Sequence, residues 1–112
     1  MLTGEWVRGF SREWVRSWNT HDLEAILEHY ADEVVLTSPV AARLLGDPSG
    51  NVRGKVGLRS YFSKGLEAYP DLRFELIDVM WGLSSVVLIL KEGTDLMVGI
   101  LETHGRAETE LP

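Results

Sequence analysis

The spacing of apolar residues changes in the second half of this chain, and that change limits the folds that it can adopt. Up to Tyr69 apolar side chains recur every three or four positions, which is the period of helices with one buried face. After Pro70-Asp71 the period switches to two, as in Leu72, Phe74 and Leu76, which is the period of β-strands. The later runs Val86–Leu90 and Leu96–Leu101 are apolar on both faces, so we expect helices to cover one face and another subunit the other. Helices followed by strands with short turns are typical of an α+β domain, with helices packed on an antiparallel sheet.

Three segments of the first part carry an apolar face at helical spacing. The first runs from Glu5 to Asn19, the second from Leu23 to Tyr30, and the third from Lys55 to Tyr69. Their apolar faces contain Trp6, Val7, Phe10, Trp14 and Trp18; Leu23, Ile26, Leu27 and Tyr30; and Leu58, Tyr61, Phe62, Leu66 and Tyr69. The spacing therefore predicts three amphipathic helices.

The strands are predicted from β-branched runs and from alternation. Val34–Ser38 is a short strand that Pro39 ends, and the turn-rich residues 39–54 follow it as a long loop, a rim or lid. The later strands are Leu72–Trp81, Val86–Leu90 and Leu96–Leu101, joined by short turns into a meander. The last segment, RAETELP, is short and polar, and we expect the final strand to be stunted or absent. The domain would then be more open at that end, or a partner would cover the unpaired edge.

Composition narrows the classes of function. With 112 residues the chain fits one domain, 1–112, with a single core. A net charge of −6 with dispersed basic residues argues against nucleic acids and membranes as partners. The absence of cysteine excludes disulfides and thiol chemistry. The N-terminal residues lack the apolar core of a signal peptide, and we expect a cytoplasmic protein.

The stretch HDLEAILEHYADE (residues 21–33) raises the question of a metal site, because it holds two of the three histidines. His21 and His29 are eight positions apart, roughly 12 Å along a helix, rather than three or four. Asp22 suits a helix cap, and His29 suits the last turn, where a partial positive charge is favourable. We therefore expect helix architecture here, with no metal and no cofactor.

The runs WNTHDLEAILEHYADEVVLTSP and RGKVGLRSYF resemble the nuclear transport factor 2-like superfamily, within it the SnoaL-like polyketide cyclase and ketosteroid isomerase branch. The resemblance extends over Trp6 to Gly105. It implies a cone-shaped, cystatin-like roll: three N-terminal helices packed on a curved, mostly antiparallel sheet around an apolar pocket, with homodimers formed through the sheet. It leaves the function open, since this fold carries isomerases, cyclases, dehydratases and binding modules.

The resemblance also implies where catalytic groups would stand. Ketosteroid isomerases have a tyrosine at the position of Trp14, a general-base aspartate at that of Ser38, and a protonated aspartate at that of Gly99. A serine hydroxyl cannot take a proton from carbon unaided, and an indole cannot titrate. Isomerisation by the family mechanism is therefore not expected.

Asp78 is the first candidate for a substitute acid or base. It lies in phase with Phe74, Leu76 and Met80. If that face of the strand is concave, Asp78 enters the pocket with a raised pKa; otherwise it belongs to a subunit interface or a sheet edge. The residues expected to line a ligand pocket are Trp14, Tyr30, Ser38, Tyr61, Phe62 and Trp81, although aromatic rings also serve as core.

Three hypotheses of function follow. The first is a module that binds a small apolar molecule in the cone of a homodimer. The second is an isomerase, cyclase or lyase that uses acid–base residues at other positions, with Asp78 first among them. The third is a structural dimer whose own aromatic side chains fill the cone. The enzyme needs a titratable group facing a cavity, the binding module needs only the cavity, and the structural protein needs neither.

Overall fold

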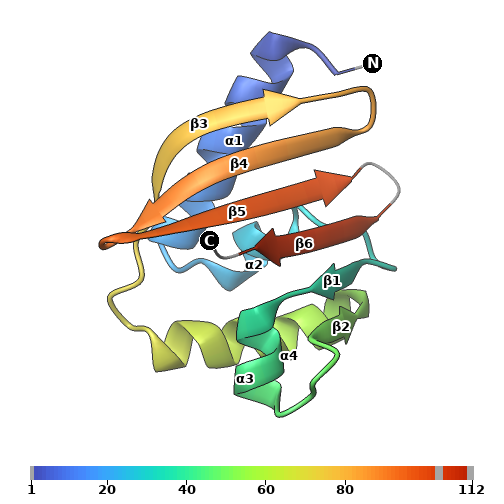
Figure 1. Ribbon diagram of the computed structural model, residues 1–112, viewed down its shortest axis with the longest axis vertical. Coiled ribbons are helices and arrows are strands. Elements are labelled where there is room, and N and C mark those ends of the chain that lie inside the picture. The colour runs from blue at the N-terminus through green and yellow to red at the C-terminus, as the bar shows by residue number, and fades with distance from the viewer. Residues whose placement is uncertain (1, 103–104, 111–112) are drawn as a thin grey trace.

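The computed structural model describes residues 2–102 and 105–110, the side chain of residue 110 excepted, and within them the chain forms four helices and six strands (Figure 1). The helices are α1 (Gly4–Asn19), α2 (Leu23–Leu27), α3 (Pro39–Leu45) and α4 (Gly54–Ala68). The strands are β1 (Val35–Thr37), β2 (Asn51–Arg53), β3 (Glu75–Trp81), β4 (Ser85–Glu92), β5 (Asp95–Glu102) and β6 (Arg106–Glu110). The predicted α+β class is confirmed.

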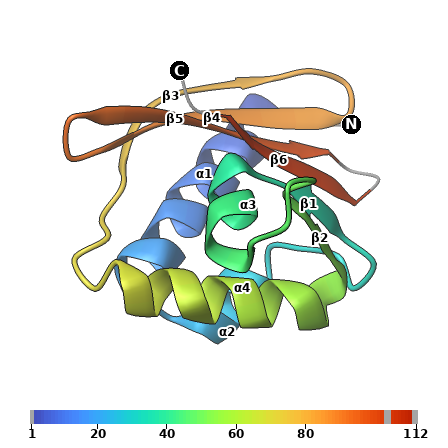
Figure 2. The same cartoon turned by 60° about the horizontal axis from the view of Figure 1, so that its bottom comes forward.

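All six strands belong to one sheet, in the order β2-β1-β6-β5-β4-β3. Every pair is antiparallel except β1 and β6, which are parallel. Figure 2 shows the helices on one side of the long strands, with α1 beneath β3 and β4 and with α4 and α2 on the side away from them. The sheet, α1 and α4 thus enclose the core from three sides. None of the helices in the described ranges has the length and hydropathy to cross a membrane.

The ends of α1 and α2 follow local side-chain chemistry. The hydroxyl of Thr3 accepts a hydrogen bond from the backbone N–H of Trp6, and the carboxylate of Asp22 accepts one from that of Ala25. Helix α2 is shorter than predicted, because the N–H groups of His29 and Tyr30 bond to carbonyls three residues back, which ends the regular helix. Tyr30 therefore lies beyond α2, where its ring can turn inward.

Residues 39–54 are not the long loop predicted from their turn residues, since they contain α3 and β2. The hydroxyl of Ser38 caps α3 by accepting from the N–H groups of Val40 and Ala41, at 3.1 and 3.5 Å. Pro39 occupies the first turn of the helix, where a missing N–H costs nothing. The proline that ends β1 thus also begins α3, and Gly46 ends it in a left-handed conformation (φ 69°).

The last strand is present and short: β6 has five residues, against eight in β4 and in β5, so only the alternative of an absent strand is wrong. Strand β6 pairs with β5 on one side and with β1 on the other, so it lies inside the sheet and leaves no unpaired edge there. Its sequence is polar because every second side chain faces away from the helices, while the small inward residue Ala107 is buried. Residues 103–104 and 111–112 lie outside the described part of the chain.

Candidate functional site

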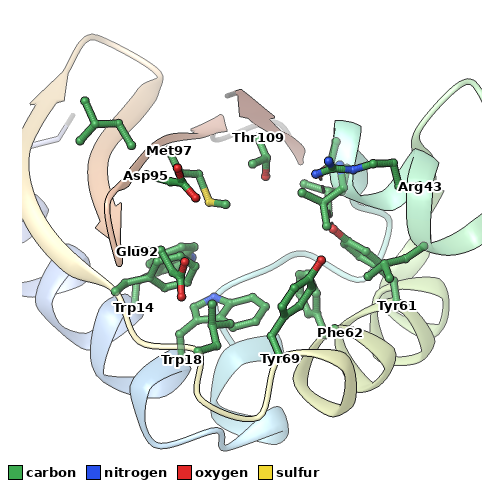
Figure 3. Close-up of a pocket in the computed structure, with 18 of the residues that line it drawn as sticks. Trp14, Trp18, Arg43, Tyr61, Phe62, Tyr69, Glu92, Asp95, Met97 and Thr109 are labelled. Atoms are coloured by element: carbon green, nitrogen blue, oxygen red, sulfur yellow. Dashed lines mark hydrogen bonds between the residues drawn. The ribbon is translucent and has the colours of Figure 1, made fainter. Parts of the chain in front are cut away.

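A cavity of about 440 Å³ lies between the second half of α1, α4 and the inner face of β5 and β6 (Figure 3). This volume is within the range of small-molecule pockets. Six aromatic side chains form what we call the inner wall: Trp14, Trp18, Tyr30, Tyr61, Phe62 and Phe74. The aromatic side chains therefore leave a cavity, whereas the hypothesis of a purely structural dimer expected them to fill it.

The rings of the inner wall brace one another. Trp18 packs edge-on against Phe62, with ring centroids 4.8 Å apart, and lies 6.0 Å from Trp14. Phe74 closes the cluster at 5.8 Å from Trp14 and 5.9 Å from Trp18. Such edge-to-face and tilted contacts are favourable and hold each ring in one orientation. The wall is thus a rigid apolar surface that exists before any ligand arrives.

Phe74 is held in this wall by Asn19, the last residue of α1. The Asn19 side chain donates to the carbonyl of Phe74 at 2.9 Å and accepts from its N–H at 2.7 Å. Both backbone groups of Phe74 are therefore satisfied by one side chain just before β3 begins. The end of α1 and the start of the sheet are joined at the edge of the cavity.

The hydroxyl of Tyr30 lies at the indole edge of the wall. It accepts a hydrogen bond from the Trp14 N–H at 3.3 Å. Burial raises the pKa of Tyr30 to about 12; the N–H groups of Trp14 and Trp18 oppose that rise, although only the Trp14 group reaches hydrogen-bond geometry. Tyr30 is consequently a neutral phenol at any physiological pH.

A second hydroxyl pair lies on the side of α3. The oxygens of Ser38 and Tyr61 are 3.5 Å apart. Burial raises the pKa of Tyr61, while the Ser38 hydroxyl and the charge of Arg43 oppose the rise. Because the Ser38 oxygen already caps α3, it is neither free nor activated as a nucleophile.

Charged side chains gather only at the opening of the cavity, which we call the mouth. Arg43 reaches it from α3, while Glu92 and Asp95 reach it from the β4–β5 turn on the other side, as Figure 3 shows. Tyr69 stands at the end of α4 and is exposed. Among the described residues, the inner wall contains no carboxylate and no imidazole. The site can thus bind apolar matter and form hydrogen bonds, but it has no buried group with a pKa near neutrality.

Five of the six residues predicted for the pocket lie on this cavity: Trp14, Tyr30, Ser38, Tyr61 and Phe62. Trp81 does not. It is 41% exposed at the far end of β3, and its ring lies where a β-carbon at Gly4 would come within 3.2 Å. Trp81 thus packs against the first turn of α1, whereas the cavity lies beside its last turns. The sequence places Trp81 correctly at the end of β3, but it does not indicate which end of α1 lies beside that residue.

Asp78 also lies away from the cavity, on an exposed part of β3. Its carboxylate accepts a hydrogen bond from the N–H of Val79 at 2.8 Å. The predicted phase fails because Leu76 pairs with Leu90 while Asp78 pairs with Ile89, so that Ile77 is an extra residue in a β-bulge. Beyond the bulge the alternation is reversed, and Asp78 faces outward with Ile89.

The two histidines of the HDLEAILEHYADE stretch bond to backbone. A ring nitrogen of His21 lies 2.8 Å from the carbonyl oxygen of Leu72, and one of His29 lies 2.9 Å from that of Ala25. In the part of the chain that the structure describes, no three His, Cys, Asp or Glu side chains come together as a metal site. The His21 ring thus joins the end of α1 to the segment before β3, and the His29 ring bonds to the backbone of α2.

The cavity is also lined by residues that were not predicted for it, among them Trp18, Glu92, Asp95 and Thr109. Trp18 lies one helical turn after Trp14, and that spacing could have identified it. Glu92, Asp95 and Thr109 come from a hairpin turn and from β6, and nothing local to those segments points to a cavity. They are brought there by the sheet order alone.

The raised pKa of Tyr30 predicts a loss of stability at alkaline pH. The unfolded chain releases this proton near pH 10 and the folded chain near 12, so the stabilisation is complete below pH 10 and is lost as the pH rises towards 12. At pH 11 we expect a loss of about 1 kcal/mol relative to pH 9 that Tyr30→Phe lacks. Urea unfolding at both pH values measures it. Tyr69→Phe, at the exposed mouth, should keep the wild-type loss, and an equal loss in Tyr30→Phe would refute the assignment.

The curved sheet, the helices on one side and the cavity between them define a cone-shaped domain of the nuclear transport factor 2-like class. The sequence matches the SnoaL-like domain family over residues 11–108, and the chain belongs to that family. The resemblance seen in the sequence is thereby confirmed. No curated protein matches the sequence.

Solved structures agree with this assignment. A SnoaL-like protein of unknown function from Burkholderia thailandensis E264 is 34% identical, with 98% of this chain and 97% of that one covered and a TM-score of 0.92. TerC co-crystallised with polyporic acid is 14% identical (95% and 91% covered, TM-score 0.76). A protein of ketosteroid isomerase-like fold from Catenulispora acidiphila DSM 44928, in complex with trimethylamine, is 8% identical (90% and 83% covered, TM-score 0.68). At these identities the last two share the fold alone.

Proposed function

We propose that this SnoaL-like domain binds a small, largely apolar molecule in its cavity. The observation that carries the proposal is a hollow of about 440 Å³ with an aromatic inner wall and with charges confined to the mouth. An aromatic wall favours a flat apolar ligand, since stacking and burial of apolar area both contribute to binding. A purely structural role would leave this volume without purpose.

Binding is favoured over acid–base catalysis by the placement of titratable groups. A general acid or base must lie within hydrogen-bond reach of the reacting atom and titrate near the working pH. The carboxylates that border the cavity, Glu92 and Asp95, stand at its mouth, and the phenols inside it are held protonated. TerC and the Catenulispora protein, which share the fold, were crystallised with small molecules, which supports a binding role for such a domain.

We also propose that the working form is a homodimer, joined through the outer face of the sheet, in the cytoplasm. On that face, β4 and β5 bring together the cross-strand pairs Val87–Ile100 and Ile89–Val98, and Met80 beside them is 50% exposed. Two-fold symmetry would place this apolar face against its own copy. A chain without cysteine suits a reducing compartment.

Gly65→Phe is expected to abolish binding of an apolar probe such as tetralin. Gly65 borders the cavity from the face of α4 that carries Leu58 and Tyr61, and a β-carbon there would meet no atom within 4 Å. The β-carbon therefore fits without displacing the protein, and we expect the phenyl group attached to it to occupy part of the ligand volume. Titration with tetralin, followed by NMR of the Trp14 and Trp18 indole N–H signals, measures the loss of affinity; we expect at least tenfold.

Gly9→Phe is the matched control for this experiment. Gly9 is an exposed helical glycine in α1, and a β-carbon there also meets nothing within 4 Å. It introduces the same side chain into a helix at a distance from the cavity, so binding should remain at the wild-type level. If tetralin binds Gly65→Phe as well as it binds Gly9→Phe, the cavity is not the binding site.

A further inference from the structure

Hydrogen-bond donors exceed acceptors on the inner wall. The phenol oxygen of Tyr30 accepts from the Trp14 N–H, and no acceptor for the hydrogen of Tyr30 is found among the described residues. The indole N–H of Trp18, a residue only 8% exposed, is close enough to Tyr30 to affect its pKa but makes no hydrogen bond in the described part of the chain. Buried polar groups are nearly always paired, so this surplus calls for an explanation.

The pair formed by Ser38 and Tyr61 adds to the surplus. The Ser38 oxygen accepts from the N–H groups of Val40 and Ala41, which occupies its lone pairs. Either oxygen could donate in the 3.5 Å contact with Tyr61, and the two N–H groups on Ser38 favour Ser38 as the donor and the Tyr61 oxygen as the acceptor. The hydrogen of Tyr61 is then free, and no acceptor for it is found among the described residues.

The protein's own acceptors do not meet these donors. Glu92 and Asp95 are the carboxylates that border the cavity, and they form no hydrogen bond with Tyr30, Tyr61 or Trp18 within the described chain. Arg43, the charged group on the side of Tyr61, can only donate. Two phenol hydrogens and one indole hydrogen are thus left for something that enters the cavity.

We infer that the cavity selects for hydrogen-bond acceptors: its ligand is a flat apolar molecule with carbonyl or ether oxygens that accept from the hydroxyls of Tyr30 and Tyr61. The inference rests on the proposed binding function and gives the chemical class of the ligand. A site built to bond an oxygen discriminates against an analogue that lacks it, because its own buried groups are then unpaired. Trp14 acts as a positioning residue, since its N–H occupies the Tyr30 oxygen and directs the phenol as a donor.

Tetralin and 1-tetralone test the inference, because they share one two-ring skeleton and differ by a ketone oxygen. Water solvates the ketone better, so the raw ratio of the two dissociation constants is not informative. The change in that ratio when a hydroxyl is removed isolates the hydrogen bond, as in a double-mutant cycle. The proteins to compare are wild type, Tyr30→Phe, Tyr61→Phe and the variant with both changes; the control is Ser63→Ala, which removes an exposed hydroxyl of α4 that does not border the cavity.

We expect the Kd of 1-tetralone to rise about three- to tenfold in Tyr30→Phe or in Tyr61→Phe, and more in the double variant, with the Kd of tetralin within twofold of wild type. Ser63→Ala should change neither dissociation constant. A ratio that stays constant through all variants, with both probes bound, would overturn the acceptor preference and leave the binding function intact. If neither probe binds wild type, the binding function itself fails. Thermal melting of each variant verifies that the fold is retained.

Discussion

Gly50→Ala is expected to lower the free energy of unfolding by about 2–4 kcal/mol. Gly50 has φ of 65°, a left-handed conformation that costs an alanine about 1 kcal/mol. A β-carbon there would also stand 2.5 Å from the carbonyl oxygen of Ser38, a backbone atom that cannot rotate away. The Ser38 N–H bonds to the carbonyl of Gly50 at 2.9 Å, so the strain would pass directly into the residue that caps α3.

Gly46→Ala provides the matched control, since Gly46 lies in the same connection with φ of 69° and with nothing within 4 Å of a β-carbon. It should cost only the conformational part, about 1 kcal/mol. Urea unfolding of the two variants measures the difference, which is the cost of the clash. Equal losses in both would mean that Gly50 does not lie against Ser38, and the wall of the cavity beside α3 would need to be redrawn.

The parts of this fold that the sequence predicts are those decided by local pattern. The apolar faces of α1 and α4 and the apolar runs of β4 and β5 are long, and each identifies its element within one or two residues. Four of the five predicted pocket residues lie on those faces or directly after β1, and the fifth, Tyr30, continues the apolar spacing of α2. Local period therefore carries most of the architecture and much of the inner wall.

The predictions that failed concern features set by one residue or by distant neighbours. Pro39 predicts the end of a strand, but the start of α3 at the same residue also depends on the Ser38 hydroxyl, which caps the helix. Strand β6 is polar and short, and it exists because β1 and β5 supply hydrogen bonds on both sides. One extra residue at Ile77 reverses the phase of β3 and removes Asp78 from the cavity. Such features depend on register and pairing, which a single segment does not contain.

The failures bear on function as well as on fold. If the alternation of β3 were unbroken, Asp78 would lie in the cavity, and a carboxylate there would favour an enzyme. With Asp78 outside, the polar chemistry of the inner wall is confined to hydroxyls and indole N–H groups, which bind and orient but do not titrate near pH 7. The structure therefore supports ligand binding over acid–base catalysis because of a single β-bulge, the one that turns Asp78 outward.

Leu88→Ala is expected to lower the free energy of unfolding by about 3–5 kcal/mol, more than either glycine substitution. Leu88 is 0% exposed on the inner face of β4 and stands opposite Gly99 in the register with β5. Because the opposite residue has no side chain that could move into the void, relaxation would recover little of the loss. Urea unfolding measures it, and a loss below 1 kcal/mol would contradict the placement of the core.

Ile89→Ala removes a similar side chain one position along the same strand, on the outer face. Ile89 is half-buried in the single chain, so truncation should cost a monomer only about 1 kcal/mol. In a dimer joined through this face, the same change weakens association, and the melting temperature then becomes more dependent on protein concentration than in wild type. Leu88→Ala should destabilise equally at every concentration at which the dimer remains intact. Melting curves of the three proteins over a hundredfold range of concentration, with sedimentation for mass, therefore separate the two faces. If wild type is a monomer and Ile89→Ala costs about 1 kcal/mol at every concentration, the outer face of the sheet is open to solvent and the dimer proposal fails.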